Sequence, residues 1–259
     1  MARIVLITGG SRGIGAATAR KAASAGYSVA INYCHDHEAA AALVGELQSS
    51  GTTAIAVRGD VSSHDDIVSV FDSVSEQLGV PTTLVNSAGI NGGHSRVEHF
   101  DSRVLERLMK VNVIGTMLCC REAARRMSTA NGGKGGAIVN VTSMAGTIGG
   151  RPGSSHYAAT KAALDSFTMG FAKEVATEGI RVNAVRPGVT LTDMTAAVRD
   201  DPEVRRNVVA TIAMNRAAEA EEMAAPIIWL LSDEASFISG SRLDASGGGF
   251  VIAAGTKGE

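Results

Sequence analysis

Apolar runs of strand length alternate with longer, helix-like segments along this chain. The first run, residues 3–8, reads RIVLIT and stops at two glycines, and a helical stretch rich in small residues follows at about residues 14–25. Similar runs separated by helix-length segments lie at residues 27–33, 53–57, 83–85, 137–141 and 181–185. One more short strand is expected at a sheet edge, at residues 242–245.

Strands that are apolar along their whole length are typical of a sheet that is covered on both faces. Their alternation with helices predicts parallel strands joined by right-handed crossovers. We therefore predict an α/β protein with a doubly wound, mainly parallel sheet of about seven strands and helices on both faces. No linker and no repeat of roughly 20 to 50 residues interrupts residues 1–259, which predicts a single domain.

The bulk composition excludes several classes of partner. The 259 residues are 45% hydrophobic, enough for one large core, and the net charge is only −2 with a pI near 6.3. Because nucleic acids and anionic lipid surfaces select basic proteins, we expect neither nucleic acid nor membrane as a partner. No apolar run approaches the roughly 20 residues of a spanning helix, and Met1 leads directly into the first strand, so we expect a cytoplasmic protein.

The cysteines and histidines form no metal-binding pattern. The three cysteines, Cys34, Cys119 and Cys120, have no CxxC spacing and are expected to be reduced thiols in the core. The six histidines are expected at the surface or in loops and not as zinc ligands, so no metal is predicted. They include His35, His37, His94 and His99.

A glycine-rich segment, TGGSRGIG at residues 8–15, connects the first strand to the first helix. Its glycines Gly9, Gly13 and Gly15 are spaced so that the backbone can turn tightly and open a helix. The unpaired amides at such a helix start would face a pyrophosphate. The same spacing occurs in ordinary strand-to-helix turns, but its position between a strand and a helix favours dinucleotide binding.

The end of the second strand indicates which dinucleotide binds. An Asp or Glu there usually meets the free ribose 2′-hydroxyl of NAD, whereas this chain has Asn32 and Tyr33. Arg12 could pair with the 2′-phosphate of NADP, the alternative being a solvated surface arginine. We therefore predict that NADP(H) is preferred, with NAD(H) as the alternative cofactor. A preference for NAD(H) would point to Asp36 or Glu38.

Tyr157 and Lys161, in the segment YAATK, share one face of a predicted helix. A free tyrosine titrates near pH 10, but a neighbouring ammonium and a positively charged nicotinamide ring both favour its phenolate. Tyr157 is therefore a candidate general acid/base, although YxxxK is short and also occurs by chance. Ser143, at the end of the apolar run IVNVTS, could hold a substrate oxygen. Asn112 lies midway along a helix expected at about residues 102–127, where the alternative is a satisfied core amide.

Together these residues resemble the short-chain dehydrogenase/reductase family over nearly the whole chain. TGGSRGIG is similar to the family's cofactor turn, GDV at residues 59–61 to its adenine-contacting segment, and NSAG at residues 86–89 to its N-x-A-G strand end. RPGVTLT at residues 186–192 is similar to the stretch that meets the nicotinamide carboxamide. The resemblance implies a Rossmann-type fold that binds NAD(P) and a catalytic tetrad of Asn112, Ser143, Tyr157 and Lys161.

The resemblance also implies the remaining site residues and their roles. Tyr157 would donate a proton to the carbonyl oxygen, and Ser143 would orient that oxygen. Lys161 would bind the nicotinamide ribose and lower the pKa of Tyr157, and Asn112 would hold a water that links Lys161 to solvent. The implied cofactor-binding residues are Thr8, Gly9, Ser11, Arg12, Gly13, Ile14, Gly15, Asn32, Tyr33, Asp60, Val61, Asn86, Ala88, Gly89, Tyr157, Lys161, Pro187, Gly188, Thr190 and Thr192.

The chain departs from the family pattern in two places. Ser87 stands where the family often has a second asparagine, and Ser143 lies fourteen residues before Tyr157, where thirteen is commoner. The extra residue falls within residues 145–155, beside the expected substrate site, and Thr142 is the alternative to Ser143. A mobile substrate lid is expected at about residues 191–215.

The resemblance is strongest to bacterial sugar-dehydrogenase-like and 3-oxoacyl-acyl-carrier-protein-reductase-like members, and it does not specify a substrate. We favour an oxidoreductase that interconverts a carbonyl and a secondary alcohol in a small molecule. The alternative is a 3-oxoacyl-acyl-carrier-protein reductase of fatty acid synthesis, with Arg125, Arg126 and Lys173 near the site entrance for docking; these residues could instead be solvated helix charges. A catalytically silent cofactor-binding scaffold is disfavoured by the intact tetrad.

The resemblance further implies a homo-oligomer, most often a tetramer, in which the helices carrying Asn112 and Tyr157 pack against copies of themselves. The helix after Tyr157 combines small residues with apolar ones, which suits close approach of another helix, although burial within one chain is the alternative. These residues are Ala162, Ala163, Phe167, Met169, Gly170, Phe171 and Ala172.

Overall fold

The computed structural model describes residues 3–249, which form one doubly wound domain around a seven-stranded sheet. All strands are parallel, in the order β3-β2-β1-β4-β5-β6-β7, so the predicted fold class is confirmed. The order reverses direction between β1 and β4, which opens a crevice at the carboxyl ends of these strands. The strands are β1 Ile4–Thr8, β2 Ser28–Tyr33, β3 Ala54–Arg58, β4 Thr83–Asn86, β5 Gly136–Val141, β6 Ile180–Pro187 and β7 Arg242–Ala245.

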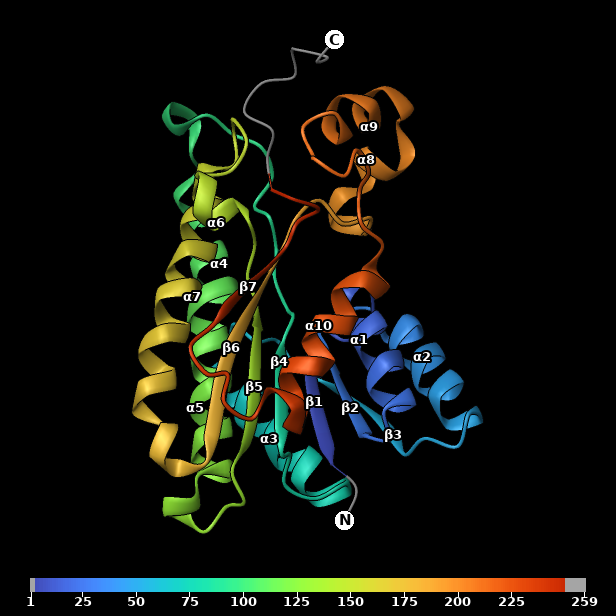
Figure 1. Cartoon of the computed structure of the whole chain (residues 1–259), viewed down its shortest axis with the longest axis vertical. Coiled ribbons are helices and arrows are strands. Elements are labelled where there is room, and N and C mark those ends of the chain that lie inside the picture. Colours follow the sequence, from blue (N-terminus) through green and yellow to red (C-terminus); the bar gives the residue numbers. More distant parts are fainter. Residues whose placement is uncertain (1–2, 250–259) are drawn as a thin grey trace.

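Helices cover both faces of the sheet (Figure 1). Helices α1, α2 and α10 contribute to one hydrophobic cluster, and α3, α5 and α7 contribute to the other. The helices are α1 Gly13–Ser24, α2 His37–Ser49, α3 His64–Gln77, α4 Ser102–Met109, α5 Thr116–Met127, α6 Ala145–Ile148, α7 Ser155–Glu174, α8 Ala196–Asp200, α9 Pro202–Val209 and α10 Ala220–Leu231.

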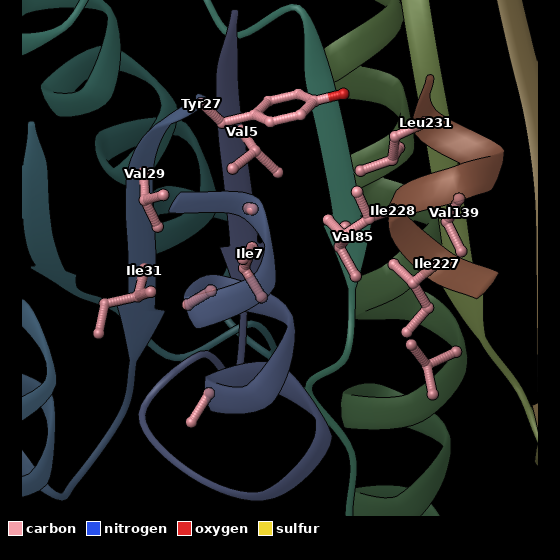
Figure 2. Packing of buried hydrophobic residues seen from close by; sticks show 14 of the residues in the cluster. Val5, Ile7, Tyr27, Val29, Ile31, Val85, Val139, Ile227, Ile228 and Leu231 are labelled. Atoms are coloured by element: carbon pink, nitrogen blue, oxygen red, sulfur yellow. The ribbon is translucent and has the colours of Figure 1, made fainter. Parts of the chain in front are cut away.

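The continuous apolar runs exist because successive strand residues enter opposite cores. In β1, Val5 and Ile7 belong to the cluster under α1 and α10, whereas Leu6 belongs to the cluster under α3 and α5. Figure 2 shows Val5 and Ile7 on the same side of the sheet as Ile227 of α10. Each of these side chains is fully buried, which stabilises the fold by about 1.5–3 kcal/mol per residue.

The helix expected at residues 102–127 is not a regular α-helix, and that prediction is wrong in its middle. Between α4 and α5 the chain forms a π-helical segment, Lys110–Gly115, which contains Asn112. A Cβ on Gly115 would lie 2.3 Å from the carbonyl oxygen of Val61, so the wide turn packs its backbone directly against the segment after β3. Such π-helical turns are frequent at functional sites.

Segment 191–215, where a lid is expected, folds into short helices that stand above the carboxyl ends of the strands (Figure 1). A 3-10 turn at Asp193–Thr195 leads into α8 and α9. The start of segment 191–215 is held by a hydrogen bond in which the amide of Leu191 donates to the carbonyl oxygen of Ala218 at 2.8 Å. No helix in the described part of the chain has both the length and the apolar character to cross a membrane.

Candidate active site

A cavity of about 750 Å³ opens at the carboxyl ends of the central strands. Most of the predicted site residues line it, although the motifs that carry them lie far apart in the sequence. Those that line it are Gly9, Ser11, Arg12, Gly13, Ile14, Asn32, Tyr33, Asp60, Val61, Ala88, Gly89, Ser143, Tyr157, Lys161, Pro187, Gly188, Thr190 and Thr192. The fold therefore assembles the sequence motifs into one site.

Four predicted site residues do not line the cavity and instead support its wall: Thr8, Gly15, Asn86 and Asn112. Thr8 Oγ1 accepts hydrogen bonds from the amides after β4, at 3.2 and 3.3 Å, and so joins β1 to the NSAG segment. Asn86 Nδ2 donates to Asn140 Oδ1 at 2.9 Å, which ties the ends of β4 and β5 together. Thr8 and Asn86 therefore contribute to the site by holding its strand ends together.

The turn after β1 has the form of a pyrophosphate cradle. Gly9 and Gly13 have φ angles of +62° and +53°, and a Cβ on Gly9 would lie 2.7 Å from Ala88 Cα. At the start of α1 the side chain of Arg12 makes no capping hydrogen bond. Within residues 3–249 the first helical amides, at residues 13–15, have no acceptor. A dinucleotide fits this site because its pyrophosphate would supply acceptors where side chains are excluded.

The other end of the cavity, after β2, brings Arg12 together with two carboxylates, Asp36 and Asp193, of which the sequence analysis did not name Asp193. Arg12 Nη1 lies 3.9 Å from Asp36 Oδ2 and 3.7 Å from Asp193 Oδ2. Asp36 lines the cavity and caps α2 by accepting from the amide of Ala39 at 3.0 Å. Asn32 faces inward, where Nδ2 donates to the carbonyl oxygen of Gly59 at 2.9 Å. A carboxylate therefore does stand near the expected 2′ position, although not at the strand end itself.

Cys34 is also part of this end of the cavity, so its prediction as a core thiol is wrong. Cys119 and Cys120 are buried as predicted, and burial raises the pKa of the Cys119 thiol to about 12. His35 and His94 are loop residues that line the cavity.

One histidine contradicts the prediction that histidines lie at the surface or in loops. His156, in the first turn of α7, is 7% exposed and packs edge-on against Phe100 with ring centroids 5.0 Å apart. Across the described part of the chain, no cluster of three or more His, Cys, Asp or Glu side chains could hold a metal ion.

Tyr157 and Lys161 occupy the first two turns of α7 and face Ser143, which follows β5. Lys161 Nζ donates to the carbonyl oxygen of Val141 at 2.9 Å and lies 5.7 Å from the Tyr157 ring centroid. Burial raises the pKa of Tyr157 to about 12, and a hydrogen bond with Ser143 opposes the rise. Near pH 7 the phenol is therefore protonated, the form that can donate a proton to a carbonyl oxygen.

Asn112 is fully buried, and its side-chain amide holds the loop after β4 against α7. Its Oδ1 accepts from the amide of Ile90, and its Nδ2 donates to the carbonyl oxygen of Ile90, both at 2.9 Å. The same Nδ2 donates to Thr160 Oγ1 at 3.1 Å, and Thr160 Oγ1 donates to the carbonyl oxygen of Tyr157 at 2.7 Å. Asn112 thus positions the turn that carries Tyr157, and the water-holding role remains a prediction.

A buried carboxylate, Asp165, lies one helical turn beyond Lys161. Burial lowers the pKa of Lys161 to about 8, and the negative charge of Asp165 opposes that decrease. Asp165 Oδ2 is 3.6 Å from Arg186 Nη1, whose guanidinium also pairs with Asp244. Asp165 therefore helps to keep Lys161 protonated near neutral pH.

In a plot of kcat/KM for carbonyl reduction against pH, the decrease on the alkaline side (the alkaline limb) is expected to move to lower pH when Asp165 is replaced with asparagine. The cationic form of Lys161 is lost as the pH rises through its pKa of about 8, and removing the neighbouring negative charge lowers that pKa further. The measurement is kcat/KM for carbonyl reduction against pH. Asp244→Asn is the control, since it removes another partner of Arg186 and should leave the limb in place. An unmoved limb in Asp165→Asn would show that Lys161 does not set it.

The three cations considered for carrier docking are not at the entrance of this chain's cavity, so that placement is wrong. Arg125 and Arg126 end α5, and the carbonyl oxygen of Met127 accepts from the amide of Gly135 at 2.7 Å, at the amino end of β5. Lys173 is in the last turn of α7, which leads to the amino end of β6. Arg126 pairs with Asp72 and with the buried Glu122. These charges therefore lie near the amino ends of the strands, whereas the cavity opens at their carboxyl ends.

Comparison with known proteins agrees with this fold. A family model described as enoyl-(acyl carrier protein) reductase matches residues 9–249. The chain is 44% identical to the uncharacterized oxidoreductase YgfF of Escherichia coli over 245 residues, 95% of this chain and 99% of the relative. It is 33% identical to the 3-oxoacyl-[acyl-carrier-protein] reductase FabG of Staphylococcus aureus over 251 residues, 97% of this chain and 99% of that one.

Two solved structures are also similar. A dehydrogenase/reductase from Sinorhizobium meliloti 1021 superposes with a TM-score of 0.87 at 35% identity, covering 96% of each chain. A blue fluorescent protein from a metagenomic library, in complex with NADPH, has a TM-score of 0.87 at 32% identity and covers 95% of this chain and 97% of that one. The fold and the site thus define an oxidoreductase with a nicotinamide dinucleotide site. The chain belongs to the short-chain dehydrogenase/reductase family.

Proposed function

We propose that this protein interconverts a carbonyl and a secondary alcohol by hydride transfer, with Tyr157 as the general acid/base. The observation that carries the proposal is that Ser143, Tyr157 and Lys161 line the same cavity as the glycine turn after β1. A reduced nicotinamide bound in this cavity supplies the hydride. The protein's residues bind the carbonyl oxygen, hold it in place and deliver the proton.

Tyr157 donates its phenolic proton to the carbonyl oxygen during reduction and takes it back during oxidation. Ser143 orients that oxygen, and it is preferred over Thr142 because the Thr142 hydroxyl points away, donating to the carbonyl oxygen of Val185 at 3.3 Å. The Ser143 hydroxyl keeps its proton free to donate, since Oγ accepts from the amide of Ala145 at 3.1 Å.

Lys161 supports Tyr157 and would hold the nicotinamide ribose. An ammonium has three donors, and the carbonyl oxygen of Val141 uses one of them. The other donors are available to the ribose and to the proton path. Asn112 positions the start of α7 through Thr160, and we retain its proposed link to a relay water.

We propose that NADP(H) is preferred over NAD(H). Arg12 lines the cavity at the end where the 2′-phosphate would lie, and its side chain is 57% exposed and therefore free to turn. A 2′-phosphate would replace its long pairs with Asp36 and Asp193 by a short, charge-assisted bond. The NADPH complex of the metagenomic relative supports this choice.

Replacing Arg12 with glutamine is expected to lower kcat/KM for NADPH by about tenfold or more and to change the value for NADH little. The reason is the loss of a charge-assisted hydrogen bond, worth about 1.5–3 kcal/mol, that only the phosphorylated ribose can make. Asp36→Asn is the matched variant, and it is expected to raise kcat/KM for NADPH relative to NADH. Asparagine retains the cap of α2 and removes the negative charge that repels the 2′-phosphate. An unchanged NADPH-to-NADH ratio in both variants would show that this end does not select the cofactor.

A second candidate function is the reduction of 3-oxoacyl thioesters on an acyl carrier protein. The names of the relatives described as 3-oxoacyl-[acyl-carrier-protein] reductases favour it. Against it, the cations considered for docking lie near the amino ends of the strands, whereas the cavity opens at their carboxyl ends. The substrate class therefore has to be decided by turnover.

The test of the proposed function is turnover with NADPH and NADH across ketones, aldose sugars and 3-oxoacyl thioesters, followed by the absorbance of the reduced nicotinamide. Reduction of a ketone or sugar supports the first candidate, and reduction restricted to thioesters supports the second. Tight NADPH binding without turnover of any carbonyl would favour a catalytically silent scaffold.

We also propose that the protein is a cytoplasmic homotetramer. The supporting observation is that apolar side chains are exposed around the π-helical segment: Val104 and Met109 of α4 and Ile114 of that segment are 39–47% exposed. Large apolar side chains exposed on neighbouring elements favour a surface that another chain covers.

A further inference from the structure

Arg151 is a cation in the cavity that the proposed reaction does not use. It lies in the loop before α7 and lines the cavity together with Ser143 and Tyr157. Within residues 3–249, the other arginines that line the cavity have carboxylate partners. Arg12 lies near Asp36 and Asp193, and Arg107 Nη2 is 2.8 Å from Asp60 Oδ2. Arg151 has no carboxylate within 4 Å among these residues.

The guanidinium of Arg151 is held in place but mostly unsatisfied. Its Nη2 donates to Thr211 Oγ1 at 2.9 Å, and Thr211 Oγ1 donates to the carbonyl oxygen of Val208 at 2.7 Å. This bond connects the loop before α7 to the segment after α9. A guanidinium has five N–H donors, so four remain without a protein acceptor in the described part of the chain. A guanidinium with free donors in one plane can bind a planar anion such as a carboxylate.

The surroundings of Arg151 also lack negative charge. The carboxylates that line the cavity are Asp36, Asp60 and Asp193, and each is paired with an arginine other than Arg151. Near Arg151 the lining is instead provided by His94 and Ser154, which lie 3.3 Å apart between Nδ1 and Oγ. A negatively charged substrate group would thus meet an uncompensated cation and further hydrogen-bonding groups.

We propose that the substrate carries a carboxylate, which Arg151 binds while the reacting carbonyl lies at Tyr157 and Ser143. The substrates are then oxo acids in the reducing direction and hydroxy acids in the oxidising direction. This inference rests on the proposed function, since it assigns the second contact of the same substrate. The additional residue implied by the fourteen-residue spacing between Ser143 and Tyr157 is expected within residues 145–155, the segment that also contains Arg151.

The experiment compares oxo acids with their methyl esters, which differ in charge and little in shape. The probes are 2-oxobutanoate, acetoacetate and 4-oxopentanoate, which place the carboxylate at increasing distance from the carbonyl. At the spacing that fits, kcat/KM for the acid is expected to exceed that of the ester by about tenfold or more. Arg151→Gln is expected to lower the acid-to-ester ratio by about tenfold to hundredfold, and Arg151→Lys by less, because lysine cannot bind a carboxylate bidentately.

Arg206→Gln is the matched control, because Arg206 is an exposed cation of α9 that does not line the cavity. It should leave the acid-to-ester ratio unchanged. Thermal unfolding and NADPH binding establish that each variant is folded. The proposal is overturned if esters are preferred at every spacing, or if the ratio in Arg151→Gln equals that of the wild-type protein.

Failure of the proposed function would be distinguishable from failure of this inference. If no carbonyl compound is reduced, the proposed function fails, and the three oxo acids are titrated calorimetrically into the protein with NADP⁺. Binding that Arg151→Gln weakens about tenfold or more would still support a carboxylate site. Absence of binding, or equal binding to the variant, would overturn it.

Discussion

Tyr157→Phe is expected to lower kcat for carbonyl reduction by about 10²–10⁴-fold, the usual contribution of a positioned general acid. The substitution removes only the hydroxyl that lies beside Ser143 and keeps the buried ring. Affinity for NADPH should remain within about threefold, because the glycine turn and Arg12 are untouched. Steady-state kinetics and fluorescence titration with NADPH provide the two measurements.

Tyr27→Phe is the control for this substitution. Tyr27 is buried at the amino end of β2, away from the cavity, and Figure 2 shows its ring beside Val5. Turnover of Tyr27→Phe should equal that of the wild-type protein. A Tyr157→Phe protein that reduces carbonyls at the wild-type rate would mean that another group donates the proton.

The strands could be predicted from the sequence because burial on both faces leaves a continuous apolar signal. The predicted run at residues 3–8 corresponds to β1 Ile4–Thr8, and the run at residues 181–185 to β6 Ile180–Pro187. The end of β6 was missed because Arg186 is charged and proline is unusual inside a strand, and only the register of Arg186 and Pro187 with β7 extends the strand. Strand ends depend on the neighbouring strand, which hydrophobic periodicity does not report.

The π-helical segment around Asn112 could not be predicted in the same way. A single wide turn shifts the helix face by a fraction of a turn, and the apolar positions on either side still suit an α-helix. The close approach of Gly115 to the carbonyl oxygen of Val61 is a tertiary contact. The place of Cys34 at the cavity is likewise decided by where the loop after β2 leads.

The misplacement of Arg125, Arg126 and Lys173 was avoidable. In a parallel sheet each connecting helix must run back toward the amino ends of the strands. The last turns of α5 and α7 therefore lie near the amino ends of the strands, away from the cavity. For α5, the hydrogen bond from the amide of Gly135 to the carbonyl oxygen of Met127 shows this position. Helix direction, added to the predicted fold, would have excluded these residues from the entrance of the same chain.

Gly15→Ala is expected to weaken NADPH binding by about hundredfold or more, with a loss of roughly 1–3 kcal/mol in the free energy of unfolding. A Cβ on Gly15 would lie 2.3 Å from the carbonyl oxygen of Gly9 and 3.0 Å from Gly10 Cα. Both contacts are with backbone, so no side-chain rotation relieves them, and the turn must open. Opening separates the amides at the start of α1 from the pyrophosphate. Fluorescence titration with NADPH and chemical denaturation measure the two effects.

Gly45→Ala separates this local clash from the general effect of placing alanine in a helix. Gly45 lies within α2, and a Cβ there would meet no heavy atom within 4 Å. The substitution should raise the free energy of unfolding by about 0.5–1 kcal/mol and leave NADPH affinity unchanged. If Gly15→Ala bound NADPH as tightly as Gly45→Ala, the closed turn after β1 would not be the pyrophosphate cradle. Weakened binding in Gly15→Ala alone would show that the approach of α1 to β1, made possible by a missing side chain, creates the cofactor site.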